Sequence, residues 1–239
     1  MSDAPLIGIC TDHVRHFPAP DRDRSYLKLY PEYPQAIARA GGTPLLIPIM
    51  PGIEQARPLL QLVRGVVMVG SDDYPPEWYG AKPHPREEYV TPQRAAFDRA
   101  FVDHLYNHTS LPVLAICGGM QLMAIFSGGK LVQHIEPTTV QHRQEGGIPT
   151  RHHVSIEPGT VLAKALGVSR AETYSLHHQG AAAVGPRLSV SARADDGLIE
   201  AVEFIDHPFR VGVQWHPERQ PESEVMQRLF QAFVRAARG

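Results

Sequence analysis

The chain has 239 residues, 43% of them hydrophobic and 20% charged, with a formal net charge of -2 at pH 7. This composition is typical of a soluble globular protein, and it offers no excess of basic residues to a nucleic acid or an anionic membrane surface. We therefore expect neither partner, and one domain spanning residues 1–239.

The cysteine content and the N-terminus indicate a cytoplasmic location. Only two cysteines occur, Cys10 and Cys117, so no disulfide framework is expected. The first ten residues, MSDAPLIGIC, carry an acidic residue and too short an apolar run for a signal peptide. No stretch reaches the roughly 20 apolar residues that span a bilayer.

In the first half, apolar runs alternate with helical patterns, which predicts a βαβ succession and a mostly parallel sheet flanked by helices. The pattern predicts strands over 5–9, 43–49, 65–70 and 111–116, and helices over 30–40, 54–63, 92–107 and from 118 onward. Residues 71–91, rich in Pro, Asp and Tyr, are expected to form a loop that either covers a site or packs on the surface.

The second half reads as short strands separated by turn residues. These are expected over 152–157, 187–192, 198–204 and 209–215, before a final amphipathic helix over 222–238. The fold class predicted is therefore α/β, with additional short strands in the second half.

Cys117 lies between a predicted buried strand and a predicted helix, and two glycines follow it. Such a turn is the arrangement of a nucleophile elbow, and the N–H groups at the start of a helix can stabilise a thiolate or an oxyanion. The alternative is that Cys117 is a small buried core residue, as free cysteines usually are.

The segment GVQWHPE ends a predicted strand with His216 and Glu218 two positions apart. In an extended segment such side chains project to the same side, so the carboxylate could orient the imidazole as the base of a Cys-His-acid triad. Taken alone, HPE is equally a strand-ending turn with a solvated acid. The conjunction of His216 and Glu218 with Cys117 favours nucleophilic catalysis.

The 13 histidines, including the pairs 152–153 and 177–178, raise the question of a metal. Adjacent residues on a strand point to opposite faces, and no HExxH or Cys-His ligand spacing is present, so no metal is expected. The GGK at 128–130 lacks the spacing of a phosphate loop, so no cofactor is expected either.

With these motifs together, the chain resembles class I glutamine amidotransferases, and among them the free-standing γ-glutamyl-γ-aminobutyrate hydrolases. The likeness runs nearly end to end and is carried by ARAGGTPLLIP, GSDDYPPEWYG, PVLAICGGMQLM, SGGKLVQHI, YSLHHQGA, ADDGLIEAVE and GVQWHPE. The resemblance implies a flavodoxin-like fold and a Cys117 attack on a γ-glutamyl amide, with His216 moving the proton.

The resemblance also implies the surroundings of the nucleophile. Gly118, with Gly70 or Ser71, would supply the oxyanion hole. Gln121 would face the substrate from the helix, and the YSLHHQ segment, taken as a strand, would line the glutamyl pocket. Its contact residues would be Ser175, Leu176 and His177.

Four positions depart from the family pattern. Gly118 stands where Arg is frequent, Ala115 where Gly is, Tyr174 where Asn is and Ala95 where Asp is. None of them is a member of the predicted triad. The missing Arg removes a charge that could hold an anionic leaving group, so the leaving amine need not be γ-aminobutyrate.

Three functions follow as hypotheses. The first is a stand-alone hydrolase of γ-glutamyl amides, of the γ-aminobutyrate or polyamine type, acting on a small molecule and leaving room for a homo-oligomer. The second is a glutaminase subunit that supplies ammonia to a separate synthase. The third is a binding or regulatory protein that kept the fold without the chemistry.

Overall fold

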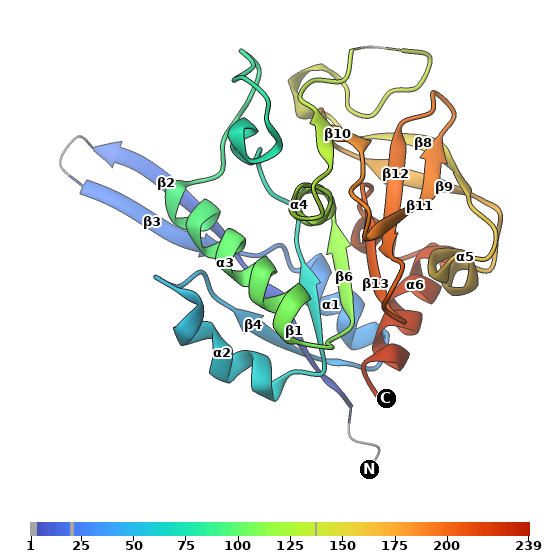
Figure 1. Cartoon of the computed structure of the whole chain (residues 1–239), viewed down its shortest axis with the longest axis horizontal. Helices are drawn as coiled ribbons and strands as arrows, with labels where there is room; N and C mark the ends of the chain where they lie inside the picture. Colours follow the sequence, from blue (N-terminus) through green and yellow to red (C-terminus); the bar gives the residue numbers. More distant parts are fainter. Residues whose placement is uncertain (1–3, 20–21, 137) are drawn as a thin grey trace.

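A computed structural model describes residues 4–19, 22–136 and 138–239 (Figure 1). Strands from both halves of the chain form one eleven-stranded sheet with helices on its two faces, and a separate two-stranded hairpin projects to one side. Within these residues, no helix combines the length and apolar character that crossing a membrane requires.

The centre of the sheet is parallel. In spatial order its strands are β4 (Thr43–Ile47), β1 (Leu6–Cys10), β5 (Gly65–Met68), β6 (Val113–Ile116) and β13 (Arg210–Val213). Strands β5, β6 and β13 are buried along their whole length, as expected for apolar strands that are covered on both faces. The predicted α/β fold with a parallel core is confirmed.

The rest of the sheet is antiparallel and continues from β13. The path runs through β12 (Ile199–Phe204), β11 (Leu188–Ala194), β8 (Thr150–Ile156) and β9 (Arg170–Ser175). Two shorter strands, β10 (Gly180–Ala183) and β7 (Lys130–Val132), pair with each other, and β10 also pairs with β12. The additional strands predicted for the second half thus extend the same sheet.

The helices divide between the two faces of the sheet. One apolar cluster contains buried residues of α2 (Ile53–Leu62), α3 (Pro92–His108) and α4 (Gly118–Phe126). The other contains those of α1 (Glu32–Arg39), α5 (Val161–Leu166) and α6 (Glu224–Ala236). Each of the expected helices is present within a few residues of its predicted ends, whereas α5 was not predicted.

The hairpin of β2 (Asp12–Ala19) and β3 (Arg22–Lys28) was not predicted. It follows β1 directly and projects beyond the sheet (Figure 1). Tyr26 and Leu27, near the base of the hairpin, are about half exposed, so these two side chains contribute little to the core. Its residues Asp12 and Lys28, at the base, reach the cavity described below.

Candidate active site

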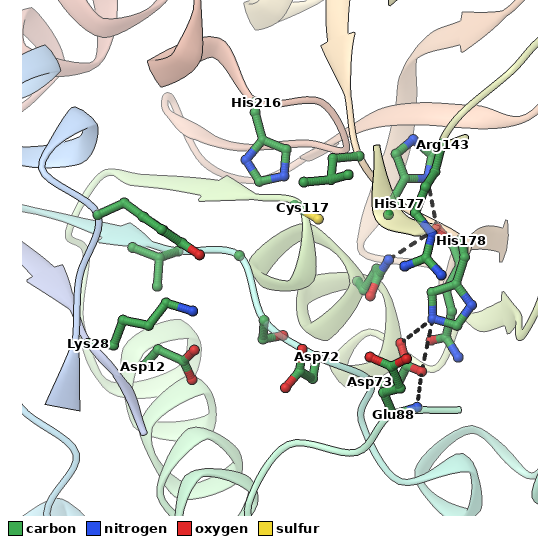
Figure 2. A pocket seen from close by; sticks show the side chains of 18 of the residues that line it. Asp12, Lys28, Asp72, Asp73, Glu88, Cys117, Arg143, His177, His178 and His216 are labelled. Atoms are coloured by element: carbon green, nitrogen blue, oxygen red, sulfur yellow. Dashed lines mark hydrogen bonds and ion pairs between the residues drawn. The ribbon is translucent and has the colours of Figure 1, made fainter. Parts of the chain in front are cut away.

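A cavity of about 240 Å³ lies beyond the carboxyl ends of the parallel strands. Asp12 follows β1, Gly70 follows β5, Cys117 follows β6 and His216 follows β13, and all four line the cavity. In open α/β sheets this edge is where ligands usually bind. The cavity is therefore the candidate active site (Figure 2).

Cys117 stands at a sharp turn between β6 and α4. It has φ 53° and ψ −109°, and it is the one non-glycine residue with positive φ in the described part of the chain. Its amide donates to Val213 O (2.8 Å), and its carbonyl accepts from Gln121 N (3.0 Å), so both sides of the turn are held by backbone bonds. A strained conformation maintained in this way is the geometry of a nucleophile elbow.

The glycines after Cys117 allow the turn to pack against the end of β5. A Cβ on Gly118 would lie 2.6 Å from Ser71 N, and one on Gly119 would lie 2.6 Å from Met68 O. Met68 belongs to β5, so its carbonyl cannot move independently of the sheet. An Arg at position 118, frequent in the resembling family, therefore does not fit this backbone without displacing Ser71.

His216 and Glu218 form a close pair, with 2.7 Å between His216 Nδ1 and Glu218 Oε1. The pairing was expected, but the extended segment was wrong, because residues Pro217–Arg219 form the 3-10 helix η3. Pro217 fits the first turn of a helix, and this tight turn is what brings the carboxylate back onto the ring.

The imidazole of His216 lies beside Cys117 (Figure 2). A Cβ on Gly70 would contact both His216 Cε1 (3.2 Å) and Cys117 Cβ (3.5 Å), so the two side chains approach the same point. Burial alone would lower the pKa of His216, but the charge of Glu218 and the adjacent Cys117 raise this pKa to about 10. The environment therefore favours an imidazolium next to the sulfur.

The three amides expected to bind an oxyanion have different surroundings. Gly70 N donates to the hydroxyl of Tyr33 (3.1 Å). The amides of Ser71 and Gly118, by contrast, donate to no other group among the described residues. The hydroxyl of Ser71 is also buried without a partner in this part of the chain. Ser71 and Gly118 are thus better placed than Gly70 to receive a ligand oxygen.

Of the four predicted substrate contacts, Gln121, Leu176 and His177 line the cavity. The side-chain amide of Gln121 donates to Gln179 O (3.2 Å) and Gln214 Oε1 (3.3 Å), which fixes its orientation. Ser175 ends β9 and does not line the cavity; its hydroxyl donates to His142 O (2.7 Å). Since β9 stops there, the rest of the YSLHHQ segment is a loop and not the expected strand.

Of the charged cavity residues, Asp72 and Asp73 were expected as part of the loop that could cover the site, whereas Asp12, Lys28 and Glu88 were not predicted. Loop 71–91 contributes the carboxylates of Asp72, Asp73 and Glu88, and the hairpin contributes Asp12 and Lys28. The centre of this loop forms the 3-10 helix η1 (Pro76–Tyr79) and packs into the core through residues such as Tyr74. The ends of the loop therefore line the cavity, and its middle packs into the core and not only on the surface.

Arg219, next to Glu218, is a cation in the cavity wall held between two aromatic rings. Its guanidinium lies 5.0 Å from the ring centroid of Tyr30 and 5.7 Å from that of Tyr174. Tyr174 is one of the departures from the family pattern, and this contact gives it a local role. Such stacking orients a guanidinium for a carboxylate while keeping its charge.

Among the described residues, one group of ligand-type side chains is close enough to hold a metal ion: His142, His152, His177 and Glu200. The sequence argument against a metal compared the members of each adjacent histidine pair. The structure instead combines one histidine from each pair with two residues from other segments.

Comparison with known proteins identifies the family of the chain. The sequence profile of the peptidase C26 family matches residues 5–218. The chain is 34% identical over 246 residues to the γ-glutamyl-γ-aminobutyrate hydrolase of Escherichia coli (strain K12), covering 97% of this chain and 93% of that protein. It is 37% identical over 211 residues to a putative glutamine amidotransferase of Mycobacterium tuberculosis, covering 87% and 67%.

A solved structure shares the fold. The crystal structure of a putative GMP synthase subunit from Thermoplasma acidophilum matches with a TM-score of 0.66 at 14% identity, covering 98% of this chain and 94% of that one. At this identity the match concerns the fold alone. The family profile and the hydrolase relatives support a hydrolase, and the chain belongs to the peptidase C26 family of class I glutamine amidotransferase-like proteins.

Proposed function

We propose that the protein hydrolyses γ-glutamyl amides, with Cys117 as nucleophile, His216 as acid and base, and Glu218 as the residue that orients His216. The observation that carries this proposal is the pairing of a strained Cys117 at the head of α4 with an imidazole that Glu218 holds at 2.7 Å. The named activity of the Escherichia coli relative supports the same substrate class.

The reaction would proceed in two steps. The thiolate of Cys117 attacks the γ-carbonyl carbon, the C–N bond breaks, and the imidazolium of His216 gives its proton to the leaving nitrogen. Water then attacks the γ-glutamyl thioester, and His216 takes its proton. Cys117 then leaves the acyl group as a thiolate, glutamate is released, and His216 is again an imidazolium, as at the start of the reaction.

The amides of Ser71 and Gly118 would hold the oxyanion in both steps. Ser71 N lies 2.6 Å from the point where a Cβ on Gly118 would fall, so the two residues are in close contact, and neither amide has another acceptor among the described residues. Fixed donors of this kind stabilise the charge that develops on the carbonyl oxygen. Arg219 is the cation we assign to the α-carboxylate of the glutamyl group, because two tyrosine rings orient it.

The far end of the cavity favours a cationic leaving amine. Four carboxylates line it, those of Asp12, Asp72, Asp73 and Glu88. Lys28 lies beside Asp12 (Figure 2), and the buried Arg94 also pairs with Asp12, so the carboxylates remain in excess. Burial and the neighbouring carboxylates raise the pKa of Asp72, which indicates mutual repulsion that a bound cation would relieve. We therefore expect γ-glutamyl polyamines to be better substrates than γ-glutamyl-γ-aminobutyrate.

The test is glutamate release from γ-glutamyl-putrescine, γ-glutamyl-γ-aminobutyrate and glutamine by the purified chain. Cys117→Ala should abolish turnover, and Cys10→Ala, which alters a buried thiol distant in sequence, should retain it. Asp72→Asn should reduce the preference for the polyamine amide. No turnover of any γ-glutamyl amide by the wild type would refute the proposal.

The two other hypotheses are outcomes of the same assay. A glutaminase subunit would hydrolyse glutamine in preference to the amides of larger amines, and a partner synthase would increase its rate. A binding protein without chemistry would release no glutamate, and a thiol reagent would label Cys117 no faster than Cys10.

A further inference from the structure

Behind the cavity wall, four segments distant in sequence bring potential metal ligands together. His142 lies in the connection between β7 and β8, His152 on β8, His177 just after β9 and Glu200 on β12. All four residues are buried, the most exposed being His152 at 7%. One donor atom from each lies within 4.8 Å of all the others.

The distances within this His3Glu cluster suit a small cation. Glu200 Oε1 lies 3.1 Å from His142 Nδ1, 3.4 Å from His177 Nε2 and 3.7 Å from His152 Nε2. Ligand atoms on a tetrahedral zinc ion, at about 2.0–2.1 Å from the metal, are about 3.3–3.4 Å apart. The contacts to Glu200 bracket that separation, so only small side-chain shifts would be needed.

The outer nitrogen of each ring faces an oxygen acceptor. His142 Nε2 lies 3.0 Å from Asp196 Oδ2, His177 Nδ1 lies 2.9 Å from Gln179 O, and His152 Nδ1 lies 3.3 Å from His153 O. When a neutral imidazole places its N–H toward this outer acceptor, the lone pair of its other nitrogen is directed inward. This is the arrangement that metal-binding histidines usually have.

The inner atoms consequently have only one another as partners, through the contacts to Glu200 Oε1. His142 Nδ1, His152 Nε2, His177 Nε2 and both carboxylate oxygens of Glu200 are buried and make no hydrogen bond within the described residues. Three lone pairs and a carboxylate facing one point repel each other, and leaving buried acceptors unpaired is costly. A divalent cation at that point would satisfy all four side chains at once.

We propose that His142, His152, His177 and Glu200 bind one Zn²⁺ ion in a closed tetrahedral site. Three imidazoles and one carboxylate are donors that zinc accepts, and four protein ligands leave no position for a reacting water. The ion is therefore structural. This inference goes beyond the proposed hydrolase activity and does not depend on it.

The zinc site would fix one wall of the cavity. His142 O accepts bonds from Ser175 Oγ (2.7 Å) and His177 N (3.2 Å), so the segment around His142 is already joined to the end of β9. Arg143 and Leu176 are the adjacent residues that line the cavity. The ion would lock these two segments together, and the neighbouring His178, which lies 3.0 Å from Asp73 Oδ2, connects them to the acidic loop.

The experiment measures the metal content of the full chain, purified without chelators and with the tag removed, by inductively coupled plasma mass spectrometry. We expect close to one zinc per chain in the wild type. His152→Gln and Glu200→Gln should each reduce this value at least about tenfold. His153→Gln is the matched control, because its exposed side chain points away from the cluster and it should keep its zinc.

A second measurement requires no variant. The wild type, stripped with a chelator and re-metallated, should melt roughly 5–15 °C higher as free Zn²⁺ is raised, and Co²⁺ should produce the strong visible absorption of a tetrahedral site. The proposal is overturned if the stripped wild type takes up neither ion. It is also overturned if folded His152→Gln binds as much zinc as His153→Gln. In either case the cluster is a proton-linked His-Glu network without metal.

Discussion

Two His-Glu groups lie at one sheet, the first just after β13 and the second spread over four segments that include β8 and β12, and they differ in what the second nitrogen of each ring faces. His216 uses Nδ1 for Glu218, which leaves its other nitrogen to Cys117 at the cavity. In the His3Glu cluster the outer nitrogens are anchored to oxygens, and the inner ones converge on Glu200. The same residue types are thus arranged for proton transfer in one place and for metal binding in the other.

The comparison is tested most strongly by replacing one histidine from each group. His216→Asn should lower kcat/KM by roughly 10³–10⁵-fold, because the thiol loses its proton acceptor, and should leave the zinc content unchanged. His152→Gln should instead remove the zinc, and it should lower kcat/KM by only about tenfold or less. Equal losses of activity in the two variants would mean that the groups do not have separate roles.

The role of Glu218 is tested by the pH dependence. Because the pKa of His216 is raised from 6.5 to about 10, the imidazolium stabilises the folded site fully below about pH 6.5, and this contribution is lost as pH rises through about 10. Glu218→Gln lowers that pKa. We expect kcat/KM to fall roughly 10²–10⁴-fold and its alkaline limb to move to lower pH. An unshifted alkaline limb would assign the titration to another group.

Gly118→Ala tests the packing beneath the thiol. The added Cβ would meet Ser71 N at 2.6 Å, so we expect a loss of about 1–3 kcal/mol in the free energy of unfolding and about a tenfold loss of kcat, because both oxyanion amides shift. Gly52→Ala is the control, since its Cβ would only touch the side chain of Gln55 at 3.4 Å. Urea unfolding of Gly118→Ala, Gly52→Ala and the wild type measures this difference in the free energy of unfolding.

Tyr174→Asn, which restores the residue frequent in the family, should have the smallest effect. It removes one of the two rings around Arg219, and a partly exposed cation–π contact is worth about 0.5–1 kcal/mol, so KM should rise roughly two- to fivefold with kcat nearly unchanged. Tyr174→Phe retains the ring and should behave as the wild type. If it does not, the hydroxyl matters rather than the stacking.

The sequence predicted the parallel core because buried strands such as β5 and β6 are continuous apolar runs between turn residues. The β2–β3 hairpin escaped prediction for the opposite reason. Its strands, DHVRHFPA and RDRSYLK, are mostly polar or charged and show no apolar alternation. They are recognisable as strands only because they pair with each other in the structure.

For the candidate site, local motifs indicated Cys117, His216 and Glu218, because a strand-helix junction and a short HPE turn are visible in the sequence. The His3Glu cluster was invisible, since its ligands lie on four segments with no ligand spacing, and only the antiparallel register brings them together. Arg219 adjoins the HPE motif, but its orientation depends on two distant tyrosine rings.

The register between β6 and β13 determines where the two reacting side chains lie. Val213 is paired with Ile116, and the amide of Cys117 continues that ladder by donating to Val213 O. Cys117 and His216 therefore follow closely after two hydrogen-bonded strands of the sheet, which fixes the spacing between the sulfur and the imidazole. Loops elsewhere can lengthen or change sequence without altering this spacing, so substrate range and nucleophile geometry are free to evolve independently.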